Sequence, residues 1–298
     1  MFNPAKSKIL TPLTDPLFKE YGITVLVKRE DLVHEIAGGN KWRKLKYNLE
    51  KAKHENKNTI VTFGGAWSNH IAATAFAGNE FGFKTIGIIR GEKTNPLNIT
   101  LKRAEQNGMK LIFVDRTTYR NKELSLKAAL GNYDKNNLHI IPEGGSNTEG
   151  FKGCCEIVQE IDAEFDFICC PVGTGVTLAG IASSLKEKQK AIGFAVMKKI
   201  YSFEKIAESF FNHHETITKT DWNNIECFYN YHFGGYAKSN NELNNFVSRF
   251  AETNKIEIEP VYTGKMFYGI YDLIKKGFFN RGDVIIAVHT GGLQYLKP

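Results

Sequence analysis

Short apolar runs rich in β-branched residues recur along the chain, about 26 residues apart over its first two thirds. They predict strands at residues 60–63, 85–89, 111–114, 138–141, 165–172, 192–196, 227–232, 256–262 and 284–289. Between them, helical spacing of apolar residues predicts helices at 97–107, 178–186, 201–211, 241–252 and 265–276. Strands alternating with helices at this period predict an α/β fold with open, twisted, mostly parallel sheets and helices on both faces.

Composition narrows the class of protein. The 298 residues are 42% hydrophobic and 24% charged, which is typical of a globular chain and excludes a disordered or fibrous one. The five cysteines include no C-x-x-C spacing, which argues against a secreted disulfide framework and a structural zinc site, and no metal site is predicted. Residues 1–18 lack the apolar core of a signal peptide, and no run is long enough to span a membrane. We therefore expect a cytoplasmic protein that does not bind membranes.

Charge adds little. Lys and Arg number 39 against 32 Asp and Glu, a net charge of +7. The densest basic stretch, 41–57, also carries Glu50 and Glu55 and repeats at helical spacing. A solvated helix face explains it better than a nucleic-acid patch, so no nucleic-acid partner is predicted.

A glycine-rich turn follows the predicted strand 165–172. It consists of Gly173, Thr174, Gly175, Val176 and Thr177. Glycines allow successive N–H groups to point at one place, threonines add hydroxyl donors, and the following helix favours negative charge there. The turn therefore predicts a phosphate site. It lacks the Gly-Lys-Ser/Thr of a P-loop and the third glycine of a dinucleotide site, and a turn that only reverses the chain is the alternative.

A lysine lies where a helix is expected to begin. Residues 38–45 read Gly-Gly-Asn-Lys-Trp-Arg-Lys-Leu, with Asn40 as the predicted N-cap and Lys41 as the first helical residue. The helix dipole and the neighbouring Arg43 and Lys44 disfavour an ammonium ion at Lys41 and favour a neutral amine, which can attack an aldehyde. A solvated surface lysine is the alternative interpretation.

Four more strand-end segments carry polar residues. They are Phe63–His70, Glu143–Asn147, Pro260–Lys265 and His289–Gly292. Ser68 alone could be a helix cap, and the other segments could be ordinary turns or hinges. They converge on one site if a single compact ligand lies at the shared strand ends.

Together these segments resemble the fold-type II enzymes that depend on pyridoxal 5′-phosphate (PLP). Within that group they resemble the family of 1-aminocyclopropane-1-carboxylate deaminases and D-cysteine desulfhydrases. The resemblance runs from Lys28-Arg29-Glu30-Asp31 to His289-Thr290-Gly291-Gly292, and residues 38–45 are its most specific part. It implies a tryptophan synthase β-like fold with a large PLP-binding domain, 1–46 and 146–298, a small inserted α/β domain, 47–145, and a homodimer.

The resemblance also implies roles for individual residues. Lys41 holds PLP as a Schiff base, and Gly173–Thr177 bind its phosphate. Asn69 hydrogen-bonds the ring hydroxyl, and Ser68 meets the substrate carboxylate or assists proton transfer. Tyr262 lies against the cofactor ring near the reacting carbon. His70 completes the substrate-binding segment 68–70.

Two positions divide the family. The resemblance implies that the deaminases have Glu where this chain has Thr263, and Leu where it has Thr290. A carboxylate would keep the pyridine nitrogen protonated and the ring a strong electron sink, whereas a hydroxyl suffices when thiolate leaves. Both threonines, and His70, therefore match the desulfhydrases. Val176 departs from the Gly or Ser of related turns, and because a β-branched residue resists positive φ, a differently shaped turn is expected.

These patterns predict α,β-elimination on a small D-amino acid, with D-cysteine giving pyruvate, ammonia and hydrogen sulfide. The group that takes the Cα proton is left open between the Lys41 amine and a neighbouring hydroxyl. Deamination of 1-aminocyclopropane-1-carboxylate to 2-oxobutyrate and ammonia is the first alternative. A non-catalytic protein that binds PLP or an amino acid is the second.

Overall fold

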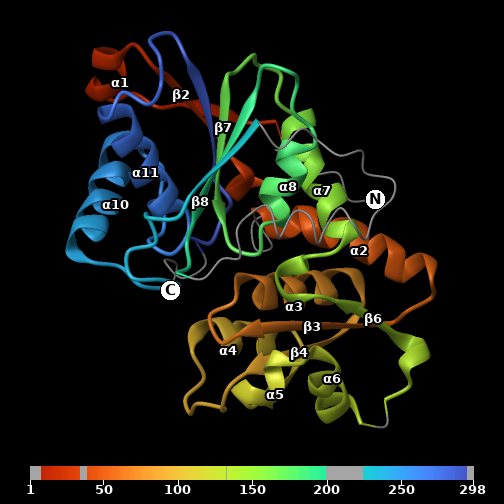
Figure 1. Ribbon diagram of the computed structural model, residues 1–298. Coiled ribbons are helices and arrows are strands. Elements are labelled where there is room, and N and C mark those ends of the chain that lie inside the picture. Colours follow the sequence, from red (N-terminus) through yellow and green to blue (C-terminus); the bar gives the residue numbers. More distant parts are fainter. Residues whose placement is uncertain (1–7, 34–38, 132, 199–223, 294–298) are drawn as a thin grey trace. The chain divides into compact units, whose positions relative to one another are not determined.

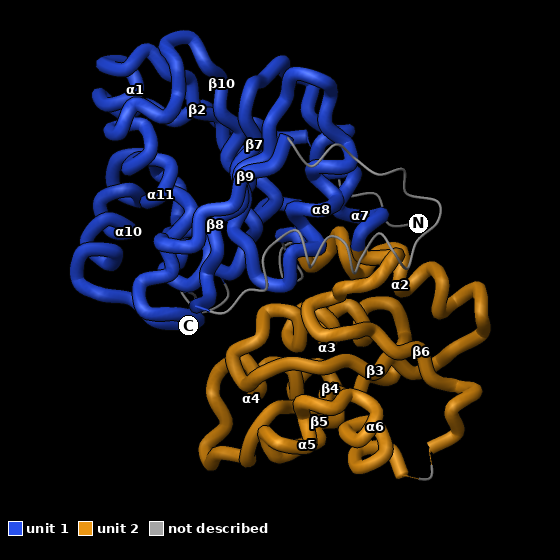
Figure 2. Tube along the Cα trace, in the orientation of Figure 1, with its two compact units in different colours: residues 1–40, 151–297 blue, residues 41–150, 298 orange. Residues whose placement is uncertain are grey.

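The chain folds into two compact units, shown in different colours in Figure 2. Unit 1 comprises residues 1–40 and 151–297, and unit 2 comprises residues 41–150. The computed structural model describes residues 8–33, 39–131, 133–198 and 224–293. The helix expected at 201–211 lies outside the described residues.

Unit 1 is built on a six-stranded sheet of order β1-β2-β10-β7-β8-β9. Its strands are β1 (Leu10–Pro12), β2 (Thr24–Lys28), β7 (Phe167–Val172), β8 (Lys190–Ala195), β9 (Ile225–Phe228) and β10 (Val284–Val288). Only β1 is antiparallel to its neighbour. The helices are α1 (Pro16–Tyr21), α7 (Thr148–Gln159, whose first three residues belong to unit 2), α8 (Val176–Ala182), α10 (Asn241–Asn254) and α11 (Thr263–Lys275), with a 3₁₀ turn at Glu30–Leu32.

Alternating side chains of the central strands fill two cores, one on each face of this sheet. Cys169 and Ile285 pack with apolar residues of α10 and α11, whereas Ile168, Cys170 and Ile286 pack with those of α7 and α8. Because successive strand residues point to opposite faces, a strand covered on both faces must be apolar throughout. Figure 1 shows α10 and α11 on one face of the sheet and α7 and α8 on the other.

Unit 2 contains a four-stranded, wholly parallel sheet of order β5-β4-β3-β6. The strands are β3 (Thr59–Gly65), β4 (Lys84–Arg90), β5 (Met109–Val114) and β6 (Leu138–Ile141). Its helices are α2 (Asn40–His54, whose first residue belongs to unit 1), α3 (Asn69–Phe81), α4 (Ile99–Gln106), α5 (Arg116–Arg120) and α6 (Lys122–Leu130), with 3₁₀ turns at Lys135–Asn137 and Glu143–Gly145. The predicted α/β class with mostly parallel sheets is confirmed.

The strand predicted at 256–262 is wrong. Ile256 and Ile258 are buried and alternate like strand residues, but the segment forms no strand. Pro260 has no N–H to give to a ladder, and the N–H groups of Val261 and Tyr262 are bound by the side chain of Glu259 instead. A turn leading into α11 therefore replaces the expected strand.

Smaller differences concern helix ends. Helix α2 begins at Asn40 itself rather than after it, and α8 runs over Val176–Ala182 rather than 178–186. The predicted end of α4 is confirmed, since its C-cap is Asn107. Helix ends are the boundaries that local sequence determines least sharply.

All five cysteines are free thiols. Cys154, Cys169 and Cys170 are fully buried, and Cys155 and Cys227 are half-buried. Burial raises the pKa of the Cys169 and Cys155 thiols. Among the described helices, none is long and apolar enough to cross a membrane.

Candidate cofactor and substrate site

The predicted phosphate turn connects β7 to α8 within unit 1. Gly175 has a φ of 85° and is the N-cap of α8, while Val176 is the first helical residue and is fully buried. Gly175 therefore takes the left-handed conformation, and Val176 is not among the residues of positive φ. Val176 therefore does not need a positive φ, and the turn does not need the different shape that was expected from it. Its side chain packs in the core shared with α7, which leaves its backbone N–H as the group it can offer a ligand.

Asn40 ties the glycine-rich segment before α2 to this turn. Its side-chain amide donates a hydrogen bond of 2.9 Å to the Thr177 hydroxyl oxygen, and both side chains are buried. Because a hydroxyl has one hydrogen and two lone pairs, the Thr177 hydrogen is left to donate to an anion. The preceding Gly39 has a φ of 82°, and a Cβ there would lie 1.9 Å from the carbonyl oxygen of Thr290. Only glycine fits this approach.

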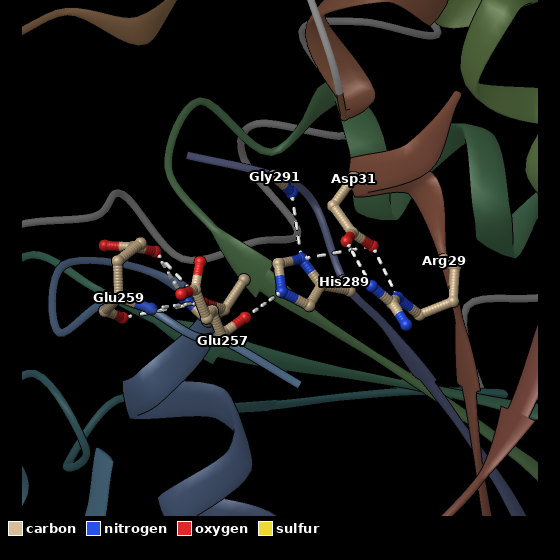
Figure 3. A network of polar contacts seen from close by, with 7 residues as sticks. Arg29, Asp31, Glu257, Glu259, His289 and Gly291 are labelled. Carbon is tan, nitrogen blue, oxygen red and sulfur yellow. Dashed lines mark hydrogen bonds and ion pairs between the residues drawn. The ribbon is translucent and has the colours of Figure 1, made fainter. Parts of the chain in front are cut away.

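The segment after β10 meets the same place, because β7 and β10 are parallel neighbours and their carboxyl ends share one edge. The carbonyl of Thr290 accepts the Asn40 N–H at 3.3 Å. The segment is held by His289, whose Nδ1 accepts the Gly291 N–H at 3.2 Å and whose Nε2 lies 2.7 Å from the carbonyl oxygen of Glu257 (Figure 3). His289 is therefore neutral, with its proton on Nε2.

Burial lowers the pKa of His289, although the Asp31 carboxylate, 3.7 Å from Nδ1, opposes the shift. Asp31 is itself held by Arg29 through two contacts of 2.9 and 2.7 Å. Nearby, the buried Lys28 and Glu30 form an ion pair of 3.2 Å. The four charged residues 28–31 thus pair with one another inside unit 1.

Tyr262 and Thr263 come directly at the start of α11. A Cβ added to Gly173 would lie 3.5 Å from Cε1 of Tyr262, so the tyrosine ring lies against the phosphate turn. The Tyr236 ring meets Tyr262 edge-on, with centroids 5.9 Å apart. Thr263 is fully buried. Unit 1 therefore brings together Gly173–Thr177, Tyr262 and Thr290.

In unit 2, Ser68 and Asn69 begin α3 at the carboxyl end of β3. Ser68 is the N-cap, and its hydroxyl accepts the Ile71 N–H at 3.4 Å. A Cβ on Gly64 would lie 2.8 Å from Cβ of Ser68, so the glycine lets this turn close. The capping role of Ser68 is compatible with a second role, because a hydroxyl that accepts one bond still has its hydrogen.

His70 is buried beside these residues. The Thr62 hydroxyl donates to the Ile141 carbonyl at 2.9 Å, so its oxygen must accept from His70 Nε2, which is also 2.9 Å away. Nδ1 of His70 consequently carries a lone pair, and in the described part of the chain it has no hydrogen-bond partner. Burial, then the charges of Lys41 and Lys44, hold the pKa of His70 well below its usual value. His70 is therefore a neutral hydrogen-bond acceptor at Nδ1.

Lys41 is the second residue of α2, half-buried, and the first residue of unit 2. It is bonded directly to Asn40, so their Cα atoms are about 3.8 Å apart. The lysine is thus attached to the residue that binds Thr177 and Thr290.

Three residues with evident roles were missed from the sequence as site residues: Glu259, Asn40 beyond its predicted capping role, and Thr62. A carboxylate just before a helix is a usable signal, since carboxylates accept hydrogen bonds from the backbone N–H groups at a helix N-terminus. Nothing local marks Thr62, because its partners His70 and Ile141 are brought together only by the fold.

The residues of unit 1 fit PLP on structural grounds. The turn is rich in glycine, and the buried Thr177 hydroxyl still has its hydrogen to donate to a phosphate. The Tyr262 ring beside Gly173 suits a flat aromatic ring joined to that phosphate. No cluster of metal-binding side chains occurs among the described residues.

Comparison with known proteins gives the same assignment. The model of the family described as "Pyridoxal-phosphate dependent enzyme" matches residues 7–291. A Pyrococcus furiosus protein provisionally named a 1-aminocyclopropane-1-carboxylate deaminase is 31% identical, over 93% of this chain and 87% of its own. The mitochondrial bifunctional D-cysteine desulfhydrase/1-aminocyclopropane-1-carboxylate deaminase of Arabidopsis thaliana is 30% identical, over 91% of this chain and 73% of its own.

A crystal structure of a homologue of 1-aminocyclopropane-1-carboxylate (ACC) deaminase superposes with a TM-score of 0.84 and 27% identity, covering 99% of this chain and 91% of the other. The described geometry and these matches have one explanation, which is that the chain belongs to the family of pyridoxal-phosphate-dependent enzymes, in the group of deaminases and desulfhydrases.

Proposed function

We propose that this enzyme eliminates the β-substituent of a small D-amino acid, with D-cysteine as its preferred substrate and pyruvate, ammonia and hydrogen sulfide as products. The observation that carries the proposal is the pair of buried threonines, Thr263 and Thr290, at the positions that the resemblance gives to Glu and Leu in the deaminases. Thiolate is a good leaving group, so the reaction does not need the stronger electron sink that opening a cyclopropane requires.

The site residues have the following roles in this proposal. PLP, when bound, supplies the electron sink for charge that develops at Cα. The turn Gly173–Thr177 binds its phosphate, Lys41 holds it covalently, and Asn69 binds its ring hydroxyl. The direct bond between Lys41 and Asn40, whose amide reaches Thr177, supports assigning the lysine and the turn to one cofactor.

Other residues of the chain handle the substrate. Ser68 and His70 belong to the segment that binds it, and the Ser68 hydroxyl meets its carboxylate. The Cα proton goes to the Lys41 amine or to a neighbouring hydroxyl, and Tyr262 covers the reacting carbon. The closeness of the Tyr262 ring to Gly173, where an added Cβ would lie 3.5 Å from Cε1, supports this place for the tyrosine.

Deamination of 1-aminocyclopropane-1-carboxylate is the second candidate, and the names of the relatives favour it. The Arabidopsis relative is named for both activities. The two candidates share the cofactor and Lys41 and differ in the bond that breaks, which is the Cβ–S bond of D-cysteine or a carbon–carbon bond of the cyclopropane ring.

The deciding experiment compares sulfide release from D-cysteine with 2-oxobutyrate release from the cyclopropane, using the PLP-loaded protein. L-cysteine and both enantiomers of serine, followed by pyruvate, are the controls for stereochemistry and leaving group. Faster turnover of the cyclopropane than of D-cysteine would overturn the proposal. Lys41→Ala should abolish both reactions and the visible absorbance of lysine-bound PLP, and retention of that absorbance would refute the cofactor assignment.

We also propose that the enzyme is a cytoplasmic homodimer. The support is the family resemblance for the dimer and the five free thiols for a reducing compartment. Light scattering on the purified holoenzyme gives the mass that decides between one and two chains.

A further inference from the structure

Glu259 is a buried carboxylate just before α11, and both of its oxygens are occupied as acceptors. Oε2 accepts the Val261 N–H at 2.6 Å and the Tyr262 N–H at 3.1 Å. Oε1 accepts the Tyr262 N–H at 3.0 Å, the Thr263 N–H at 2.8 Å and the Thr263 hydroxyl at 3.1 Å. Only 1% of Glu259 is exposed. Figure 3 shows it beside the contact between Glu257 and His289.

This arrangement requires the ionised carboxylate. Every group that approaches the two oxygens is a hydrogen donor, so a proton on either oxygen would face an N–H or an O–H. Burial raises the pKa of Glu259, and the backbone N–H bonds of Thr263, Val261 and Tyr262 oppose that shift. Burying a carboxylate is costly unless hydrogen-bond donors surround it, and here all the donors belong to Val261–Thr263, so Glu259 holds this segment in place.

The hydroxyl of Thr263 is oriented by the same residue. It donates to Glu259 Oε1 and accepts the backbone N–H of Glu259 at 3.1 Å. Its hydrogen is therefore committed, and toward any further partner the Thr263 oxygen can only accept.

Lys265, in the first turn of α11, is a cation that interacts electrostatically with Glu259. Its ammonium donates to the carbonyls of Gly235 at 2.8 Å and Val196 at 3.3 Å, and it is fully buried. Burial lowers the pKa of Lys265 to about 8, and the charge of Glu259 opposes that shift. A positive charge inside unit 1 thus favours the ionised form of Glu259.

We propose that Glu259 is a positioning residue that holds the Tyr262 ring against the phosphate turn and fixes the Thr263 hydroxyl as an acceptor. The proposal rests on the cofactor site proposed above but not on the identity of the amino-acid substrate. Glu259 acts through Tyr262 and Thr263.

The test compares Glu259→Gln with Glu257→Gln in the full-length protein. Gln has the shape of Glu but places an NH₂ group against N–H donors, whereas the Glu257 side chain is exposed two residues away and serves as the matched control. In the cofactor-free protein, we expect faster hydrogen exchange in the peptide covering Val261–Thr263 for Glu259→Gln only. With PLP bound, kcat should fall about 10- to 100-fold, with a smaller change in KM and a shifted visible spectrum.

A second variant guards against misfolding. Glu259→Asp keeps the charge but shortens the side chain, so we expect it to fold, to retain PLP and to show a smaller loss of kcat. Thr263→Val should lower kcat in the wild-type protein and add little in the Glu259→Gln protein, because the two residues act together. Unchanged exchange and an unchanged spectrum in Glu259→Gln, or equal effects of Glu257→Gln, would refute the positioning role. If the wild-type protein binds PLP but does not turn over D-cysteine, only the proposed substrate is refuted.

Discussion

The side-chain amide of Asn40 donates a 2.9 Å hydrogen bond to the hydroxyl of Thr177, across 137 residues of sequence. The bond joins the residue before Lys41 to the first turn of α8. Loss of a buried hydrogen bond of this kind costs about 1–3 kcal/mol when one partner remains unpaired.

We therefore expect Asn40→Ala and Thr177→Val each to weaken PLP binding to the cofactor-free protein, by about tenfold. Titration followed by absorbance measures the dissociation constants. The double variant should lose less than the sum of the single losses, since both changes remove the same bond. Strict additivity would contradict a direct link between these two residues.

A second prediction concerns Gly39. A Cβ at this position meets the Thr290 carbonyl at 1.9 Å, whereas Gly82 has a similar φ of 73° with nothing within 4 Å of an added Cβ. Gly82→Ala should cost about 1–2 kcal/mol of unfolding free energy, for the conformation alone. Gly39→Ala should cost more and should also reduce PLP content. Urea unfolding of both proteins checks this, and equal costs would mean that the contact with Thr290 relaxes freely.

A third prediction concerns the exchange of Thr263 for Glu, the residue that the resemblance gives to the deaminases at this position. The Thr263 oxygen is 3.1 Å from Glu259 Oε1, so Thr263→Glu would place two carboxylates in one buried site. One of them must take up a proton or move away. We expect this variant to be less stable and to gain no turnover of the cyclopropane, with Thr263→Gln as the uncharged control. A gain in 2-oxobutyrate formation without loss of stability would contradict this expectation.

A fourth prediction concerns acid stability. In the folded chain the pKa values of His70 and His289 lie below the usual 6.5, both chiefly because of burial. Below pH 6.5 the unfolded chain therefore binds protons that the folded chain does not, and the free energy of unfolding falls as the pH falls. Each histidine contributes at most about 1.4 kcal/mol per pH unit.

The measurement is urea unfolding at intervals from pH 7.5 to 5.5. His70→Gln and His289→Gln should each flatten the decline, and the double variant should flatten it further. The readout is the slope, so a general loss of stability in a variant does not confuse the result. Slopes identical to that of the wild-type protein would show that neither histidine is held neutral.

The sequence predicted strands at or overlapping β3 to β10, because a strand covered on both faces reads as an apolar run, but it predicted neither β1 nor β2. The same rule misled at Ile256 and Ile258, which alternate like strand residues while their segment is a turn. What distinguishes them is Pro260 together with the side-chain acceptor of Glu259, and neither contributes to periodicity.

Within the site, prediction reached the glycine turns and their hydroxyls because these depend on local backbone conformation. The residues that orient these hydroxyls could not be predicted from the sequence. The Asn40–Thr177 bond and the Thr62–His70 contact depend on how distant strand ends meet, and only the fold supplies that information. At Val176 the sequence suggested a strained backbone that does not occur, because Gly175, one residue earlier, takes the positive φ.

The buried thiols have a consequence for a protein that would release hydrosulfide. Hydrosulfide is a reducing nucleophile that attacks sulfur–sulfur bonds, and none of the cysteines forms one. Cys154, Cys169 and Cys170 are shielded from solvent, and the two half-buried thiols include Cys155, whose raised pKa keeps its sulfur in the unreactive protonated form. The fold therefore contains no disulfide bond that released hydrosulfide would reduce.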